Sequence, residues 1–138
     1  NDTMGGYIAK KLVKKLIGMG KAILGARILV MGMTFKENVA DIRNSKVVDI
    51  INELKDFGVE VDVVDPYADP EEVKKMYGFR LIEKPLGNYD AVVVAVAHDA
   101  YQGLDEKYFK SLTCDKAVLV DVKGMYRDKI HELKYWSL

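Results

Sequence analysis

The stretch AVVVAVA, residues 91–97, contains only apolar residues. A strand in the middle of a parallel sheet is covered on both faces, so its residues are apolar without the alternation of a half-exposed strand. We therefore predict that this stretch is a central strand of a parallel sheet. Further segments with the composition of strands are 27–31, 59–66, 79–82 and 117–122.

The segments between these strands have helical spacing. Apolar residues at Ile8, Leu12 and Leu16 predict a helix over 4–20, with four lysines largely on its other side. The other expected helices cover residues 45–57, 68–78, 105–112 and 128–133. Strands that alternate with helices predict the α/β class, as a Rossmann-like open parallel sheet with helices on both faces, preceded by one helix.

Composition limits the kind of protein. A length of 138 residues favours one domain, and 49% hydrophobic with 30% charged residues is typical of a globular protein. Lysine plus arginine and aspartate plus glutamate both number 21, so no net charge attracts nucleic acid or an anionic membrane. No apolar run reaches the ~18 residues of a membrane span, and no signal peptide opens the chain. A single cysteine cannot form an internal disulfide, which favours a reducing compartment and a cytoplasmic location.

A long loop follows the strand at 27–31. Its sequence is GMTFKENVADIRNS, residues 32–45, where a strand that ends in glycine would usually turn at once into a helix. In open parallel sheets, ligands bind beyond the carboxyl ends of the strands, near the point where strand order reverses. The basic or amphoteric side chains expected along this edge are Lys36, Arg43, His98, Lys123 and Arg127. A phosphate-bearing ligand would find cations and backbone N–H groups there, so we predict a binding loop.

The loop does not have the pattern of a dinucleotide cradle. That cradle needs G-x-G-x-x-G after the first strand, and Gly32 has no partner glycines. Asp65 stands where a ribose-binding acid would lie, but without the glycines we interpret it as a residue that ends a strand. A phosphoacceptor receiver domain uses a lysine placed like Lys123, but it needs acidic residues where this chain has Gly32-Met33-Thr34.

Histidine and cysteine residues give no pattern of a metal or nucleophile site. His98 and His131 lie far apart in the sequence without a ligand-spaced partner, so we predict no metal site. His98 is interpreted as a turn or core-edge residue. Cys114 has no convincing base nearby and is interpreted as a packed small hydrophobe.

Three segments carry a resemblance to a known family, namely residues 26–69, 89–101 and 118–126. The first contains the motif G-x-x-F-K-x-x-x-x-D-x-R at 32–43, and Asp65-Pro66 follows it. These segments resemble the C-terminal, UDP-binding domain of the nucleotide-sugar 6-dehydrogenases, the UDP-glucose/GDP-mannose dehydrogenase family. They are most similar to the branch that oxidises UDP-N-acetylhexosamines for capsule, O-antigen and Vi-type polysaccharides.

The resemblance implies roles for individual residues. Phe35 and Lys36 match the pair that the family places against the UDP-sugar, and Lys123 matches a basic contact to the nucleotide sugar, where many members have arginine. Arg43 matches the arginine that reaches the phosphates of NAD, which the family binds mainly through an N-terminal domain. Asp41 is expected to orient the loop by pairing with Arg43. A compact ammonium and a guanidinium fork both suit oxygen-rich ligands.

The resemblance also implies a domain division. Residues 1–24, which begin NDTMGGYIAKKLV, are similar to the end of the family's central helical domain and a linker. Residues 25–138 are similar to its UDP-sugar-binding domain. Because the chain does not begin with methionine, we interpret it as a fragment or a processed product. A homodimer is expected for the full-length enzyme.

The family's reaction needs more than these residues contain. NAD oxidises the C6 alcohol of the sugar to a carboxylate through a thiohemiacetal on a cysteine, which lies in a glycine-rich motif that this chain lacks. No catalytic residue is therefore assigned, and the fragment alone is expected to be an inactive binding module of an oxidoreductase. Two alternatives stay open, namely a free-standing nucleotide-binding module and a doubly wound domain that serves protein interaction.

Overall fold

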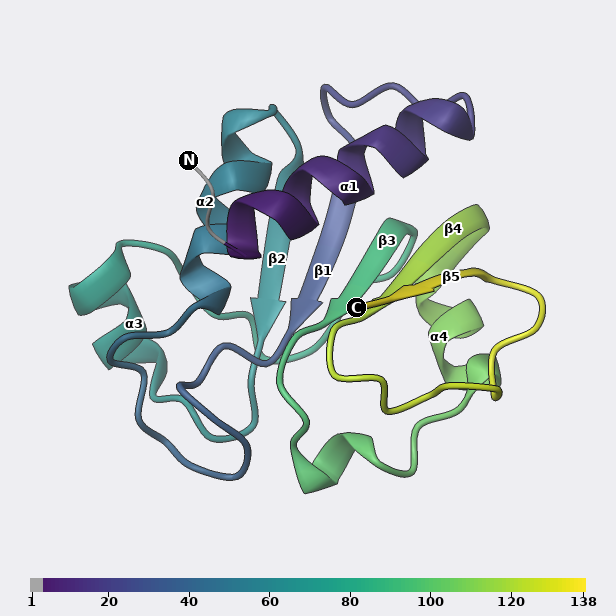
Figure 1. Cartoon of the computed structure of the whole chain (residues 1–138). Helices are drawn as coiled ribbons and strands as arrows, with labels where there is room; N and C mark the ends of the chain where they lie inside the picture. The colour runs from purple at the N-terminus through teal and green to yellow at the C-terminus, as the bar shows by residue number, and fades with distance from the viewer. Residues whose placement is uncertain (1–3) are drawn as a thin grey trace.

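The computed structural model describes residues 4–138, and its centre is a parallel sheet of five strands in the order β2-β1-β3-β4-β5 (Figure 1). The strands are β1 (Arg27–Met31), β2 (Glu60–Val64), β3 (Tyr89–Val94), β4 (Thr113–Asp121) and β5 (Lys134–Ser137). The helices are α1 (Met4–Gly18), α2 (Val47–Asp56), α3 (Pro70–Tyr77), the 3-10 helix η1 (Asp99–Tyr101) and α4 (Glu106–Leu112). None of the helices within this described range is long and apolar enough to cross a membrane.

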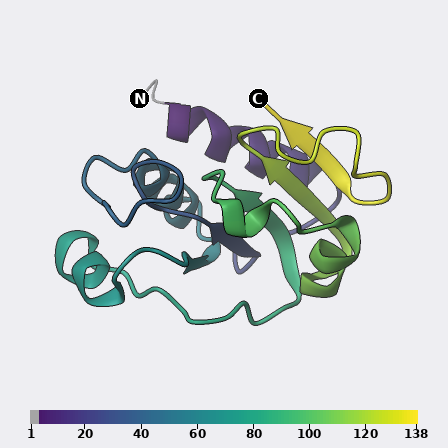
Figure 2. The same ribbon diagram turned by 90° about the horizontal axis from the view of Figure 1, so that it is seen from below.

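The two faces of the sheet bury different side chains. Along β1, Ile28 and Val30 join a hydrophobic cluster that includes α1 and α2, whereas Leu29 and Met31 join a second cluster that includes Phe109 of α4. Successive residues of a strand point to opposite faces, and both sets are apolar because both faces are covered. Figure 2 shows α1 and α2 on one side of the sheet and α4 on the other. The predicted α/β class, with an open parallel sheet and helices on both faces, is confirmed.

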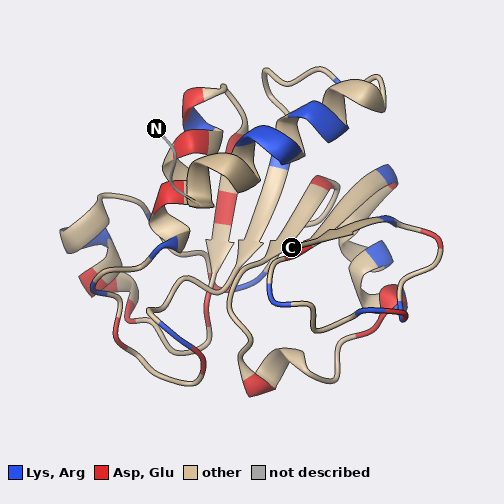
Figure 3. Cartoon of the chain, in the orientation of Figure 1, with Lys and Arg blue, Asp and Glu red and all other residues tan. Residues whose placement is uncertain are grey.

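Helix α1 packs closely against α2. Its apolar residues, such as Ile8 and Leu12, are buried in the core, whereas its lysines, blue in Figure 3, are exposed or half-buried. Glycine at position 5 permits the close approach of the two helices. A Cβ atom on Gly5 would lie 2.6 Å from the Cβ of Asp49 and 2.9 Å from the backbone nitrogen of Ile50.

The division of the chain after residue 24 stays a prediction. Residues 1–3, the first of the quoted opening NDTMGGYIAKKLV, lie outside the described residues. From Met4 onward, α1 contacts α2 and β4, and its apolar side belongs to the same hydrophobic cluster as the sheet. Helix α1 therefore shares its core with the rest of the chain.

Residues 79–82, expected as a short strand, do not form one. One backbone hydrogen bond, from the N–H of Ile82 to the carbonyl of Val63 at 3.0 Å, joins this segment to β2. Phe79 and Leu81 are buried in the core, so the segment is apolar because it packs under the sheet edge and not because it extends the ladder. The predicted central strand at 91–97 is confirmed over its first four residues, since β3 ends at Val94.

Residues 128–133, expected as a last helix, are irregular. The carboxylate of Glu106 reaches from α4 and accepts the backbone N–H groups of His131, Glu132 and Leu133 at 3.0, 2.7 and 2.8 Å. Asp128 adopts a left-handed conformation, with φ 64°. Because a side chain satisfies these donors, the segment needs no helical hydrogen bonds. The chain then forms β5, which the sequence analysis missed.

We expect Gly5→Ala to lower the free energy of unfolding by about 1–3 kcal/mol, the usual effect of overpacking a tight contact. The added methyl group would meet backbone atoms of α2, which cannot swing aside. Gly18→Ala is the control, because this position lies in the same helix and has no atom within 4 Å of an added Cβ. Urea unfolding gives both values, and equal stabilities of the two variants would contradict the close contact between the helices.

Candidate functional site

A buried aspartate joins two segments at the carboxyl edge of the sheet. Asp65 directly follows β2, and its side chain is wholly buried. Oδ2 accepts the backbone N–H groups of Met33 and Thr34 at 2.7 and 3.3 Å. Oδ1 accepts those of Tyr67 and Ala68 at 2.7 and 3.0 Å. One carboxylate therefore fixes both the start of the loop after β1 and the turn after β2.

His98 reaches the same carboxylate from the segment after β3. Its ring is wholly buried, and Nε2 lies 3.0 Å from Oδ2 of Asp65. On the other side of the ring, Nδ1 accepts the backbone N–H of Asn38 at 2.9 Å. The side-chain oxygen of Asn38 in turn accepts the backbone N–H of Asp99 at 2.8 Å. The predicted core-edge position of His98 is correct, but its contacts to the loop were missed, because periodicity says nothing of side chains that meet across strands.

The point where strand order reverses is closed by the chain itself. This point lies between β1 and β3, since β2 and β3 flank β1. Gly32 has φ 91°, and a Cβ atom there would lie only 2.8 Å from the Cβ of Val96. Only glycine fits such a conformation and contact. The segments after β1 and β3 therefore touch at this point.

The loop of residues 32–44, which we call the substrate loop, presents Phe35 and Lys36 outward. Its bend is held by the N–H of Phe35, which donates to the carbonyl of Asp41 at 2.7 Å, and by the hydroxyl of Thr34, which donates to the carbonyl of Lys36 at 2.8 Å. Phe35 is 54% exposed, and the Lys36 ammonium forms no ion pair or hydrogen bond within residues 4–138. An apolar ring and a free cation therefore stand on a loop whose base is fixed.

Arg43 lies on the same loop and is paired. Its Nε and one terminal nitrogen donate to the two carboxylate oxygens of Asp41, each at 3.0 Å. The pairing expected from the sequence is thus confirmed. Hydrogen bonds from Arg43 lower the pKa of Asp41 to about 2, and Asp41 raises the pKa of Arg43. The Arg43 side chain is 75% exposed, so it can contact a further anion.

A second buried aspartate shapes the turn that carries Lys123. Asp121 ends β4 and accepts the backbone N–H groups of Met125 and Tyr126 at 2.9 and 2.7 Å, and the hydroxyl of Tyr135 at 2.5 Å. Lys123 is exposed on this turn. Only β3 separates β1 from β4, so the strand ends from which this turn and the substrate loop begin are two strand spacings, ~10 Å, apart. Figure 3 shows both signs of charge along these loops.

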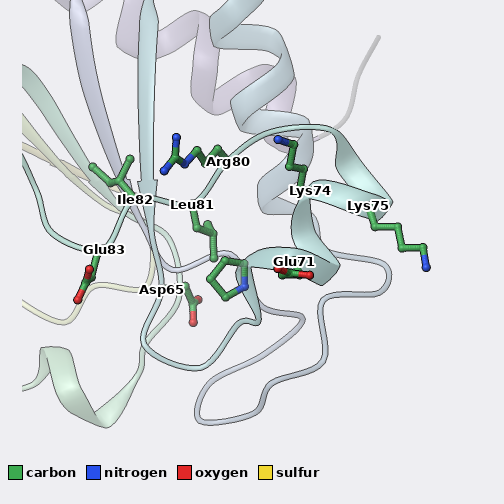
Figure 4. A pocket seen from close by; sticks show the side chains of 9 residues that line it. Asp65, Glu71, Lys74, Lys75, Arg80, Leu81, Ile82 and Glu83 are labelled. Atoms are coloured by element: carbon green, nitrogen blue, oxygen red, sulfur yellow. The ribbon is translucent and has the colours of Figure 1, made fainter.

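An open groove lies next to this site, between α3 and the segment that follows it, and Asp65 borders both (Figure 4). Its volume is about 950 Å³, and it is lined by Asp65, Pro70, Glu71, Lys74, Lys75, Arg80, Leu81, Ile82 and Glu83. None of the four predicted binding residues lines this groove. The predicted residues lie on an open surface instead. Among residues 4–138, no group of three or more histidine, cysteine or acidic residues could hold a metal ion.

Cys114 is not packed as a small hydrophobe in the way expected. Its Sγ is partly exposed and lies 3.3 Å from Nζ of Lys21, which pairs with Asp90 at 2.7 Å. This cluster lies at the start of β4, at the opposite end of the sheet from the substrate loop. The cysteine therefore has no part in the candidate site.

An open parallel sheet of this order is the doubly wound α/β fold, in which ligands bind beyond the carboxyl ends of the strands. The comparison with known families makes the class specific. The chain belongs to the UDP-glucose/GDP-mannose dehydrogenase family, whose UDP binding domain matches residues 29–128. The site predicted on the substrate loop lies within that match.

Individual relatives support the assignment. The chain is 43% identical over 126 residues to Protein CapL of Staphylococcus aureus, covering 91% of this chain and 30% of the relative. It is 39% identical over 124 residues to a UDP-N-acetyl-D-glucosamine 6-dehydrogenase of Salmonella typhi, covering 89% and 29%. The solved NDP-N-acetyl-D-galactosaminuronic acid dehydrogenase of Methanosarcina mazei has a similar fold, with a TM-score of 0.78, 23% identity, and coverage of 96% and 28%. The chain thus spans under a third of the length of these relatives.

We expect Asp41 to titrate with a pKa of about 2. Because folding lowers this pKa, the contribution of the ion pair to stability is present above the unfolded-state pKa and is lost as the pH falls through about 2. In Arg43→Ala, the pKa of Asp41 should return toward 3.8, whereas Arg80→Ala should leave it unchanged. Carbon-13 NMR of the carboxyl groups measures it. An Asp41 pKa that is the same with and without Arg43 would contradict the pairing.

Proposed function

We propose that this chain is the UDP-binding part of an NAD-dependent nucleotide-sugar 6-dehydrogenase, which oxidises the C6 alcohol of a UDP-N-acetylhexosamine or UDP-hexose to a carboxylate. One observation carries the proposal: the substrate loop is fixed at its base, while the Phe35 ring and the Lys36 ammonium are exposed and uncommitted. The family match includes this loop. Relatives named as 6-dehydrogenases of UDP-N-acetyl-D-glucosamine support the sugar class.

The residues take distinct roles in this proposal. Lys36 and Lys123 bind phosphate or sugar oxygens of the UDP-sugar, and the Phe35 ring packs against its apolar parts. The exposed guanidinium of Arg43 contacts the phosphates of NAD, which a further part of the enzyme binds. Oxidation of an alcohol to a carboxylate releases two hydrides in two steps, and two NAD molecules, bound in turn, would accept them. No residue of this chain is assigned to the chemical step.

The proposal extends to the setting of the enzyme. The single cysteine suits a reducing compartment, so we place the enzyme in the cytoplasm. The uronic acid product suits the synthesis of a surface polysaccharide such as a capsule. The full-length enzyme is proposed to be a homodimer.

UDP should shift the amide NMR signals of the substrate loop and of the turn at Lys123 when it is titrated into this chain. Lys36→Ala should weaken UDP binding by roughly one to two orders of magnitude, because a hydrogen bond to a charged group contributes about 1.5–3 kcal/mol. The melting temperature should hardly change, since Lys36 has no partner in the described residues 4–138 that its loss would leave unpaired.

Lys74→Ala is the matched control for this titration. Lys74 is also an exposed lysine, but it lines the groove beside α3. UDP affinity should be unchanged in this variant. Weaker binding in Lys74→Ala together with normal binding in Lys36→Ala would place the nucleotide in the groove and refute the assignment to the loop.

In the full-length enzyme, Arg43→Ala should raise KM for NAD by about tenfold, as expected for the loss of a charged phosphate contact, and leave KM for the UDP-sugar unchanged. Steady-state NADH formation measures both constants. This chain alone should form no NADH from NAD and UDP-N-acetylglucosamine. A raised KM for the UDP-sugar with unchanged NAD kinetics would show that Arg43 and Lys36 have the reverse roles.

A further inference from the structure

His98 was assigned no contact to a ligand, yet its ring is hydrogen-bonded to the substrate loop. We propose that His98 is a positioning residue, whose neutral form with hydrogen on Nε2 holds this loop in the conformation that presents Phe35 and Lys36 to UDP. The inference rests on the proposed function only in taking the loop to bind UDP. The claim that His98 fixes the conformation of the loop can be tested without a ligand.

The contacts of the ring fix its protonation state. The backbone N–H of Asn38 can only donate, and it lies 2.9 Å from Nδ1 of His98, so Nδ1 presents its lone pair. The ring hydrogen is then on Nε2, which lies 3.0 Å from the carboxylate of Asp65. Nε2 therefore anchors the ring to the end of β2, with the hydroxyl oxygen of Thr34 at 3.4 Å, and Nδ1 holds the loop at Asn38.

Asn38 links the His98 ring to the part of the loop that carries Phe35 and Lys36. It lies two positions after Lys36 and has φ 62°, a left-handed conformation that non-glycine residues seldom adopt. Its N–H is bound to His98, and its side-chain oxygen is bound to the backbone N–H of Asp99. Loss of the Nδ1 acceptor removes one of these two restraints, so the backbone around Lys36 gains freedom.

Packing alone does not explain the position of His98. The ring centroids of Tyr67 and Tyr101 lie 4.8 and 5.4 Å from the centroid of the imidazole. Another planar side chain could keep those contacts. The hydrogen bond to the loop requires an acceptor at the place of Nδ1. The role of His98 can therefore be separated from packing by variants that keep one ring nitrogen's function and lose the other's.

Two variants make this separation. His98→Asn keeps an acceptor close to the place of Nδ1, whereas His98→Gln keeps a donor close to the place of Nε2 and loses the acceptor. In His98→Gln, hydrogen exchange at the Asn38 amide should become roughly tenfold faster, because its acceptor is gone. UDP should bind this variant about three- to tenfold more weakly, as for the loss of one hydrogen bond. His98→Asn should retain most of the protection and the affinity.

Tyr101→Phe is the packing control. The Tyr101 ring contacts His98, and its buried hydroxyl has no hydrogen-bond partner in the part of the chain that the structure describes. This variant should change neither exchange at Asn38 nor UDP affinity. Melting temperatures of all three variants are measured alongside, so that exchange can be compared at equal global stability.

The outcomes test the role of His98 separately from the proposed function. Unchanged exchange at Asn38 in His98→Gln would overturn the role of His98, as would equal effects of the Asn and Gln variants. Faster exchange with unchanged UDP affinity would also overturn it, since the hold would then not serve binding. A failure of the unchanged chain to bind UDP would count against the proposed function, whereas the exchange comparison would still test the hold on the loop.

Discussion

The buried carboxylate of Asp65 is the contact on which the carboxyl edge of the sheet depends. A charge removed from water is tolerated only when its oxygens are fully hydrogen-bonded. Here four backbone N–H groups and the His98 ring supply those bonds, and they come from three separate segments. The segments after β1, β2 and β3 must therefore reach their places together. Order in the substrate loop is a consequence of burying this one side chain.

Asp121, at the end of β4, is a second buried carboxylate that accepts backbone N–H groups. Its buried carboxylate fixes the turn that carries Lys123, as Asp65 fixes the loop that carries Lys36. In both cases, backbone N–H groups that donate to the buried carboxylate fix the backbone of the loop. The lysine on that loop takes no part in these hydrogen bonds. A ligand that binds such preordered loops loses little further conformational entropy in the protein. The lysine side chains are thus exposed on backbone that hydrogen bonds hold in place.

The sequence predicted those parts of the structure that depend on local pattern. The apolar run in β3, the apolar side of α1 and the pairing of Asp41 with Arg43 all follow from neighbours in the chain. The wrong predictions depend on distant partners. Residues 128–133 have helical composition, but the carboxylate of Glu106 accepts the backbone N–H groups of residues 131–133. His98 looked like an ordinary core residue because its partners, Asn38 and Asp65, lie 60 and 33 positions away. The assigned ligand contacts stay predictions, since they were taken from the family resemblance of the motif at 32–43 and of the turn at Lys123.

The charges of the candidate site suggest why its cations differ. Lys36 and Lys123 have no ion-pair partner within residues 4–138, whereas Arg43 is largely neutralised by Asp41. Under the proposed function, each phosphate of the nucleotide sugar brings a negative charge, and the two unpaired ammonium groups would compensate these charges. Arg43 keeps its direction through the bidentate pair and retains an exposed edge, which suits contact with a second ligand more than strong attraction of the first. The exposed Phe35 ring completes this arrangement. Exposed apolar surface is unfavourable in water, and under the proposed function a nucleotide sugar would cover the ring and pair the charges in the same step.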